Sequence, residues 1–500
     1  MIKRTIIIIL LMAGTFTAFP QHVDFDSRCS RAYDHILTLQ LDKAGALLDE
    51  EEKINPGNVY VPYLRNYIDF IKLFVSQDKS LYKELSNRKS GYFSTVDELG
   101  DTCRYKKWML GNMHLQWSVN KIIFGDLFSG AFELSRAYYL IKENQKQFPE
   151  FEPDMLSMGV LHVIFGLVPD KFDWLLNLFA LEGDVEKGKK ELSGFLALTE
   201  QDRRLRYLYT ETLFFSGFIE LNIHTDKEKL EGLLEKAEQM NDSVMMIKFL
   251  QLNILMRTGR NEDALELFDA IDSLNQTGYP FAYLDYLHGE SLLRSLNYTE
   301  AVRKYDLFLD DFKGENYVKD AWRKKAWAAF LSGDSALYLK NMEQVISCGD
   351  SRLEIDKEAL REAQSGSFPD VTLLLARLLF DGGYYTKALN ILEKDKLWLL
   401  FSAKKTVQYY YRLGRIYEQL DRKNEAKTNY LLTIQYGCEM EDYYAANAAL
   451  KLGEMLENEG NYGLARESYE QCLEMNFDQY RTSIRTRAKE GLKRISGKDR

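Results

Sequence analysis

LGRIY at residues 413–417 and AKTNY at residues 426–430 form a pattern that recurs further along the chain as LGEML (452–456) and ARESY (465–469). Within these segments the apolar and aromatic residues are three or four positions apart, which places them on one face of an α-helix. The intervening stretch contains Asp421 in one copy and Gly460 in the other, and both residue types favour the end of a helix. The pattern therefore predicts two helices joined by a tight turn, followed by a second such pair.

The same pattern appears elsewhere when the sequence is aligned with itself at a period in the high thirties. Six windows then carry an alanine at their twentieth position and a bulky apolar or aromatic residue four positions later. A small residue precedes the alanine by twelve positions in five windows, so we expect small residues to face each other, with Ala426 packed against Gly414. The windows begin at Phe25, Met245, Ala282, Pro369, Val407 and Ala446, and their alanines are Ala44, Ala264, Ala301, Ala388, Ala426 and Ala465.

The two quoted units closely resemble the tetratricopeptide consensus. This resemblance implies an all-α fold, namely a right-handed superhelical solenoid of antiparallel helix pairs. We expect the array at residues 241–479, including a weaker unit near Trp322, Trp327 and Gly333, and a polar capping helix at residues 480–500. That last segment holds eight Lys or Arg against two acids, so contact with an anionic partner is the alternative interpretation.

Residues 21–240 follow the period less clearly. One repeat-like unit at residues 25–58 precedes long apolar-periodic stretches, for which we expect non-standard helical pairs. The sequence GVLHVIFGLVP at residues 159–169 precedes WLL at 174–176, and Gly183, Asp184 and Gly188 follow. With the flanking helix these residues cover 131–192 and are similar to a tetratricopeptide family that includes the fungal inclusion-body clearance mediator. That family has no catalytic residues, so the resemblance concerns architecture.

The uncharged stretch from Met155 to Val168 and a second apolar run after Asp173 require a choice between a membrane segment and a buried helical hairpin. A helix that spans a bilayer needs about 20 consecutive apolar residues, and neither run reaches that length. We therefore expect the hairpin.

The first residues have the features of a secretory signal peptide. Lys3 and Arg4 precede an apolar run from Thr5 to Gly14, and small residues follow around Ala18. An uncleaved membrane anchor is the alternative, but the run is shorter than the roughly 20 residues that a spanning helix needs. We expect residues 1–20 to be removed and the mature protein to be periplasmic or secreted, without a transmembrane span.

The formal net charge of -10 argues against nucleic acid as a partner, because binding to phosphates requires a basic surface. The five cysteines are scattered and suggest apolar core positions, although one disulfide remains an alternative in an exported protein. The segment GDVEKGKK at 183–190 lacks the Ser or Thr of a phosphate-binding loop, which favours a helix-entry turn. His162 lies on an apolar face, which is typical of a core histidine. We therefore predict no catalytic residue, no cofactor and no metal.

A solenoid presents a concave surface formed by its first helices, and such surfaces bind extended peptides or helices. Tyr411, Arg415 and Asn447 occupy first-helix positions that face the groove in tetratricopeptide proteins, and we expect them to be solvent-accessible there; a solvated helix face without a partner is the alternative. The predicted function is a non-catalytic exported scaffold for a protein or peptide partner. The alternatives are a periplasmic glycan- or lipid-binding protein with an aromatic concave groove, and an enzyme with a site near residues 155–190.

Overall fold

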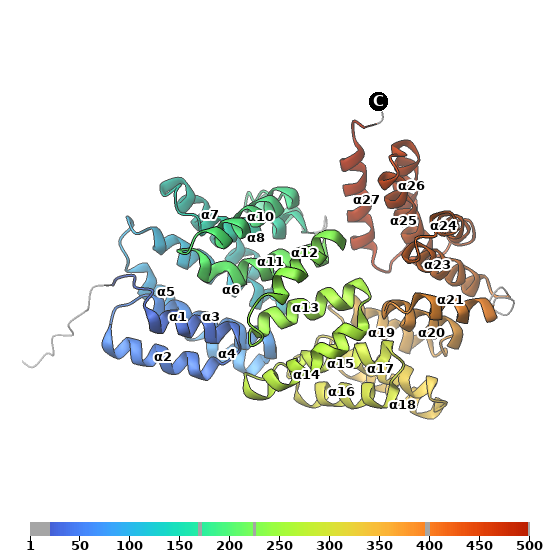
Figure 1. Cartoon of the computed structure of the whole chain (residues 1–500), viewed down its shortest axis with the longest axis horizontal. Helices are drawn as coiled ribbons and strands as arrows, with labels where there is room; N and C mark the ends of the chain where they lie inside the picture. Colours follow the sequence, from blue (N-terminus) through green and yellow to red (C-terminus); the bar gives the residue numbers. More distant parts are fainter. Residues whose placement is uncertain (1–20, 169–172, 224–226, 396–400, 499–500) are drawn as a thin grey trace, which may run out of the picture.

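The computed structural model describes residues 21–168, 173–223, 227–395 and 401–498, which form helices and contain no β-strand (Figure 1). The predicted all-α fold of stacked helix pairs is confirmed. The predicted signal segment, residues 1–20, lies outside the described residues. No helix within the described residues is long and apolar enough to cross a membrane.

The helices before residue 240 form the region without a clear period. They are α1 (Ser27–Leu37), α2 (Leu41–Ile54), α3 (Tyr60–Ser76), α4 (Lys79–Ser86), α5 (Lys89–Asp97), α6 (Arg104–Ile123), α7 (Leu127–Gln147), α8 (Asp154–Gly166), α9 (Asp173–Leu178), α10 (Val185–Gln201), the 3-10 helix η2 (Arg206–Leu208), α11 (Tyr209–Asn222) and α12 (Lys227–Glu238).

The helices after residue 240 form the repeat array and the C-terminal helix. They are α13 (Met245–Thr258), α14 (Asn261–Thr277), α15 (Tyr283–Arg294), α16 (Tyr298–Asp311), α17 (Val318–Leu331), α18 (Ser335–Ser347), α19 (Glu354–Ser365), α20 (Val371–Asp381), α21 (Tyr385–Lys394), α23 (Ala403–Gln419), α24 (Lys423–Gly437), α25 (Tyr444–Asn458), α26 (Tyr462–Glu474) and α27 (Arg481–Ile495).

Each of the six sequence windows forms one helix pair, with the alanine on the second helix. All six alanines are 0% exposed, and so are the six bulky residues four positions later, because both face the first helix of the pair. The four predicted turn residues all adopt the left-handed backbone conformation expected at a helix end; they are Gly259, Gly383, Asp421 and Gly460. The weaker unit near Trp327 is also a pair, α17 and α18.

The side chain that lies nearest to Gly414 is Tyr430, four positions after the predicted Ala426. A Cβ built on Gly414 would lie 2.7 Å from the ring of Tyr430. A Cβ built on Gly453 would lie 2.6 Å from the ring of Tyr469. The small position on the first helix therefore accommodates an aromatic ring of the second helix. The buried ring fills the space that two alanine-sized residues would leave empty.

Between residues 59 and 240 the chain continues in helices, as expected. The largest pairs are α6 with α7 and α8 with α10. Helices α8 and α10 approach closely because Gly159 and Gly188 face each other; a Cβ on Gly188 would lie 2.6 Å from the carbonyl oxygen of Gly159. The predicted buried hairpin is only half correct, since α8 is buried while Trp174 and Leu178 on α9 are exposed.

The hydrophobic core continues along the curved array in two large clusters. One cluster extends from α1 to α20, and the other from α20 to α27, so α20 contributes to both through Leu378 and Leu379. Helix α27, drawn red, lies on the side of the C-terminal helices that faces the green helices α10 and α12 (Figure 1). It packs on α25 and α26 through Ile484, Ala488 and Gly491. The late helices thus return toward helices of the first half.

Candidate functional site

A cavity of about 610 Å³ lies where the array curves back on itself. It is lined by the first helices of five pairs, namely α13, α15, α20, α23 and α25, and by residues of α12, α21 and α27. Its volume is within the range of cavities that hold small molecules or single peptide side chains. The charged residues that line it are Lys227, Arg257, Glu290, Arg294, Asp381, Arg415, Glu418, Lys451, Glu454 and Arg487.

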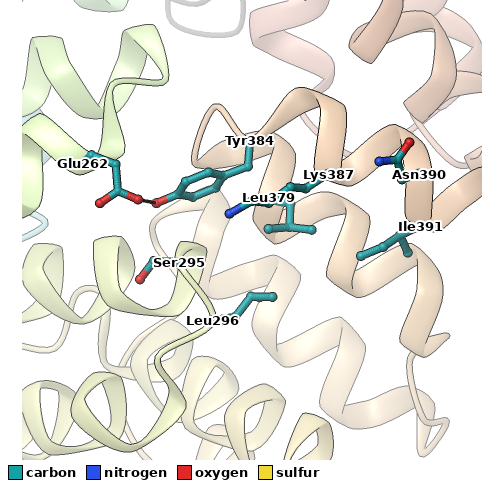
Figure 2. A pocket seen from close by; sticks show the side chains of 8 residues that line it. All are labelled: Glu262, Ser295, Leu296, Leu379, Tyr384, Lys387, Asn390 and Ile391. Atoms are coloured by element: carbon teal, nitrogen blue, oxygen red, sulfur yellow. Dashed lines mark hydrogen bonds between the residues drawn. The ribbon is translucent and has the colours of Figure 1, made fainter.

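Two turns far apart in sequence meet beside this cavity. Gly383, with φ +81°, approaches Gly259 so closely that a Cβ there would lie 1.8 Å from the Gly259 carbonyl oxygen, so no side chain fits. The Tyr384 hydroxyl donates a hydrogen bond of 2.6 Å to Glu262 (Figure 2). It also accepts one of 3.3 Å from Asn261. These contacts join α13–α14 to α20–α21.

A second contact joins two elements that line the cavity. Lys227 at the start of α12 donates a hydrogen bond of 2.8 Å to the side-chain oxygen of Gln419 at the end of α23. A smaller pocket of about 330 Å³ lies next to the first contact and is lined by residues that include Tyr384, Lys387 and Ile391 (Figure 2). The larger cavity has the richer set of charged groups, so it is the candidate site.

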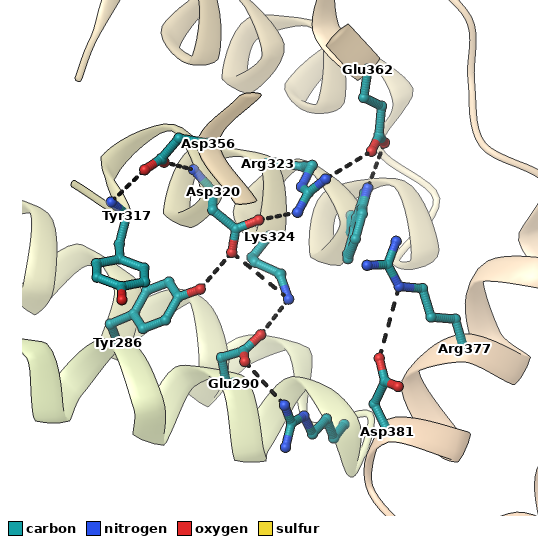
Figure 3. Close-up of polar contacts among 12 residues, drawn as sticks. Tyr286, Glu290, Tyr317, Asp320, Arg323, Lys324, Asp356, Glu362, Arg377 and Asp381 are labelled. Carbon is teal, nitrogen blue, oxygen red and sulfur yellow. Dashed lines mark hydrogen bonds and ion pairs between the residues drawn. The ribbon is translucent and has the colours of Figure 1, made fainter. Parts of the chain in front are cut away.

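A network of buried charged groups lies behind the cavity (Figure 3). Asp320 on α17 is 0% exposed and accepts a hydrogen bond of 2.6 Å from the Tyr286 hydroxyl. Its carboxylate also pairs with Arg323, which reaches Glu362 at 3.6 Å. Lys324 connects Asp320 to Glu290, and Glu290 lines the cavity. The network therefore links α19 and α17 to the lining of the cavity.

All four carboxylates that line the cavity have a cationic partner. The pairs are Glu290 with Lys324 and Arg294, Asp381 with Arg377, Glu418 with Lys451, and Glu454 with Lys451 and Arg487. Burial by itself would raise the pKa of Glu454, but the charges of Lys451 and Arg487 outweigh it and lower the pKa to about 2. The pKa of Glu290 is likewise about 2, because Lys324 and Arg294 outweigh the effect of burial. Both groups are anionic at neutral pH.

The structure brings the three predicted groove residues together. Arg415 and Asn447 line the cavity. Tyr411 is only 3% exposed, so the expectation that it is solvent-accessible is wrong. Its hydroxyl oxygen accepts hydrogen bonds from Arg415 Nη1 at 3.1 Å and Asn447 Nδ2 at 2.7 Å. Tyr411 thus lies behind the cavity surface and positions the other two side chains.

Sequence reasoning missed the arginines that come from the rest of the array. Arg257 and Arg294 are supplied by α13 and α15, and Arg487 by α27. Arg257 and Arg294 occupy the same position in two successive windows, whereas Arg487 lies more than 190 positions after Arg294 and outside the six windows. The basic composition of residues 480–500 was the only sequence signal that pointed toward one of them.

Other predicted motifs have structural roles. His162 is 5% exposed and its Nδ1 lies 2.6 Å from Glu191, which confirms the prediction of a core histidine. Asp184 caps α10 by accepting a hydrogen bond from the backbone N–H of Lys187, which confirms a helix-entry turn. Both belong to the packing of α8 and α10.

Within the described residues, one group has the composition of a metal site. Asp26, Cys29 and Glu51 have ligand atoms within 4.8 Å of one another. Arg28 pairs with both carboxylates, and Asp26 caps α1. Burial raises the pKa of the Cys29 thiol above its usual range, which disfavours the thiolate that metals require. The group is therefore explained by helix capping. All five cysteines are free, and Cys29 and Cys472 are buried.

A model of the tetratricopeptide repeat family matches residues 407–434 and 446–479. These two segments are therefore similar to tetratricopeptide repeats. They correspond to α23–α24 and α25–α26, which include the helices that carry Arg415 and Asn447. The similarity of residues 131–192 to the clearance-mediator family lies outside both matched segments and stays a prediction.

Three solved structures illustrate what the whole chain is similar to. A monomeric IFIT1 mutant with m7Gppp-AAAA is 15% identical, with coverage of 90% of this chain and 95% of that chain and a TM-score of 0.34. The human IFIT1 dimer with PPP-AAAA is 13% identical, with coverage of 91% and 97% and a TM-score of 0.35. The APC/C hetero-tetramer Cut9-Hcn1 is 11% identical, with coverage of 93% and 94% and a TM-score of 0.28. No curated protein matches this chain.

Proposed function

We propose that this protein is an exported, non-catalytic scaffold that binds a protein or peptide partner at the central cavity. The observation that carries the proposal is the position of Arg415 and Asn447 on the first helices of the two tetratricopeptide repeats, facing the cavity. First helices line the concave surface with which solenoids bind extended segments. The signal-like segment at residues 1–20 supports export.

The alternative of a glycan- or lipid-binding protein has less support. Such ligands are commonly held against aromatic or apolar surfaces, and the aromatic side chains that line the cavity within the described residues are Phe380 and Tyr385. The remaining lining is dominated by charged and amide groups. This composition favours a polar segment of a polypeptide.

Partner capture with a blocked cavity tests the proposal. The tagged chain would be recovered from the exported fraction of its native cells, and the co-purified proteins would be identified by mass spectrometry. Asn253 on α13 lines the cavity, so Asn253→Trp should fill part of it and abolish capture of the specific partner. A thermal melt shows whether this variant is folded.

The matched control is Asn424→Trp, because Asn424 is exposed on α24, a second helix that does not line the cavity. This control should capture the partner like the wild type. Undiminished capture by a folded Asn253→Trp variant would contradict the assignment of the partner site to the cavity.

A further inference from the structure

We infer that the cavity is a binding site for a compact oxyanion, a carboxylate or phosphate group, held by arginines from four helices. The inference deepens the proposed function and rests on it, since it names the chemistry of the group that the cavity receives. The four arginines are Arg257 on α13, Arg294 on α15, Arg415 on α23 and Arg487 on α27.

The first argument is the balance of charge in the cavity. Its lining carries six cationic and four anionic side chains, whereas the whole chain has a net charge of -10. Two of the four carboxylates, Glu290 and Asp381, are also paired from behind the lining by Lys324 and Arg377. When Lys324 and Arg377 are counted with the lining residues, the excess of positive charge around the cavity is larger. Enclosed charge of one sign favours a ligand of the other sign.

The second argument is the environment of Arg415. Glu418, one turn along α23, contributes a favourable negative charge, but it pairs with Lys451 rather than with Arg415. The Arg415 guanidinium donates a hydrogen bond to the Tyr411 hydroxyl. The guanidinium carbon also lies 4.7 Å from the centre of the Phe380 ring. Its Nε is buried without a hydrogen-bond partner. The guanidinium on the cavity lining therefore has hydrogen-bonding capacity that an anion in the cavity would use.

The third argument is the proximity of the other arginines. Burial lowers the pKa of Arg257, and the positive charges of Arg487 and Arg415 lower it further. These three guanidinium groups therefore share one electrostatic environment although their helices are far apart in sequence. A guanidinium offers planar paired N–H donors, which match the two or three oxygens of a carboxylate or phosphate. An oxyanion between them would relieve their mutual repulsion.

The same chemistry could be supplied by an acidic side chain of a bound peptide or by a free organic or inorganic anion. Titration calorimetry of the purified chain separates these sources with three probes: inorganic phosphate, citrate and a hexaglutamate peptide, each at constant ionic strength. Binding of the peptide alone assigns the oxyanion to a polypeptide partner. Binding of citrate or phosphate assigns it to a free anion. Absence of binding by all three probes would overturn the inference.

Arg415→Met removes the charge but keeps a linear side chain over Phe380, and it should weaken probe binding at least about tenfold. Arg415→Lys keeps the charge and should recover part of the affinity. Arg487→Met provides a second test, because Lys451 still pairs with Glu454 in that variant. Arg481→Met on α27 makes the same change of net charge at an exposed position outside the cavity.

Arg481→Met should bind the probes like the wild type. Equal losses in this control and in Arg415→Met would show non-specific attraction and overturn the inference. Because the probes are tested without a partner, probe binding combined with failed partner capture would count against the proposed function and leave the oxyanion site standing.

Discussion

The hydroxyl oxygen of Tyr411 on α23 accepts a hydrogen bond of 2.7 Å from the side-chain amide of Asn447 on α25. This bond joins the first helices of the two tetratricopeptide repeats. The same hydroxyl also accepts a hydrogen bond from Arg415. One buried phenol therefore orients Arg415 and Asn447, which both line the cavity.

Tyr411→Phe should therefore disturb the cavity without creating a void. We expect the free energy of unfolding to fall by about 1 to 2 kcal/mol, since two donors lose their acceptor. Probe binding in the cavity should weaken because Arg415 loses its positioning contact. Urea unfolding and calorimetry measure the two effects. Tyr410→Phe on the same helix is the control, because the Tyr410 hydroxyl has no hydrogen-bond partner among the described residues and should change neither quantity.

Gly414→Ala tests the packing of a glycine under an aromatic ring. The new Cβ would lie 2.7 Å from the Tyr430 ring, and this overpacking should cost about 1 to 3 kcal/mol in the free energy of unfolding. Gly45→Ala on α2 is the matched control, because a Cβ there meets nothing within 4 Å. Its higher helix propensity should stabilise the protein by up to about 1 kcal/mol. Equal effects of the two substitutions would refute the packing explanation.

Asp154→Asn tests a buried carboxyl group in α8. Asp154 is 0% exposed, and burial raises its pKa to about 7, although a hydrogen bond from Asn144 opposes the shift. Since the folded pKa is above the ordinary value of 3.8, the folded state binds this proton more tightly than the unfolded state. The contribution of this group to stability is therefore fully present below pH 3.8 and is lost as the pH rises toward 7.

We expect Asp154→Asn to raise the free energy of unfolding at pH 8 by up to about 3 kcal/mol and to leave it nearly unchanged at pH 4. Thermal melts across this pH range measure the difference. The exposed Asp269 on α14 supplies the control variant Asp269→Asn, which should not alter the pH dependence. A gain of the same size at both pH values would mean that ionisation of Asp154 is not its cause.

Export can be tested by fractionating native cells. The signal-like segment predicts a chain shortened by about twenty residues outside the cytosol. Mass spectrometry of the N-terminus would identify the cleavage site. Full-length protein confined to the cytosol would contradict this prediction.

The sequence predicted the helix pairs well because their determinants are local. The alanine and the bulky apolar or aromatic residue four positions later lie on one face of the second helix, and both positions are completely buried in the structure. The left-handed turns at Gly259, Gly383 and Gly460 follow from the same local chemistry. Sequence spacing alone does not show that the side chain nearest to Gly414 is Tyr430 rather than Ala426.

The candidate site could be predicted only in part. Arg415 and Asn447 were identified because each occupies a repeat position that faces the concave surface, whereas the burial of Tyr411 depends on α25 lying against α23. The sequence by itself thus determined the helices, their pairing and two polar positions. Only the tertiary structure decided that Arg257 and Arg487 share one cavity with them. That arrangement depends on the curvature accumulated over many small angles between successive pairs, and on contacts between segments far apart in the chain, such as Gly259 with Gly383.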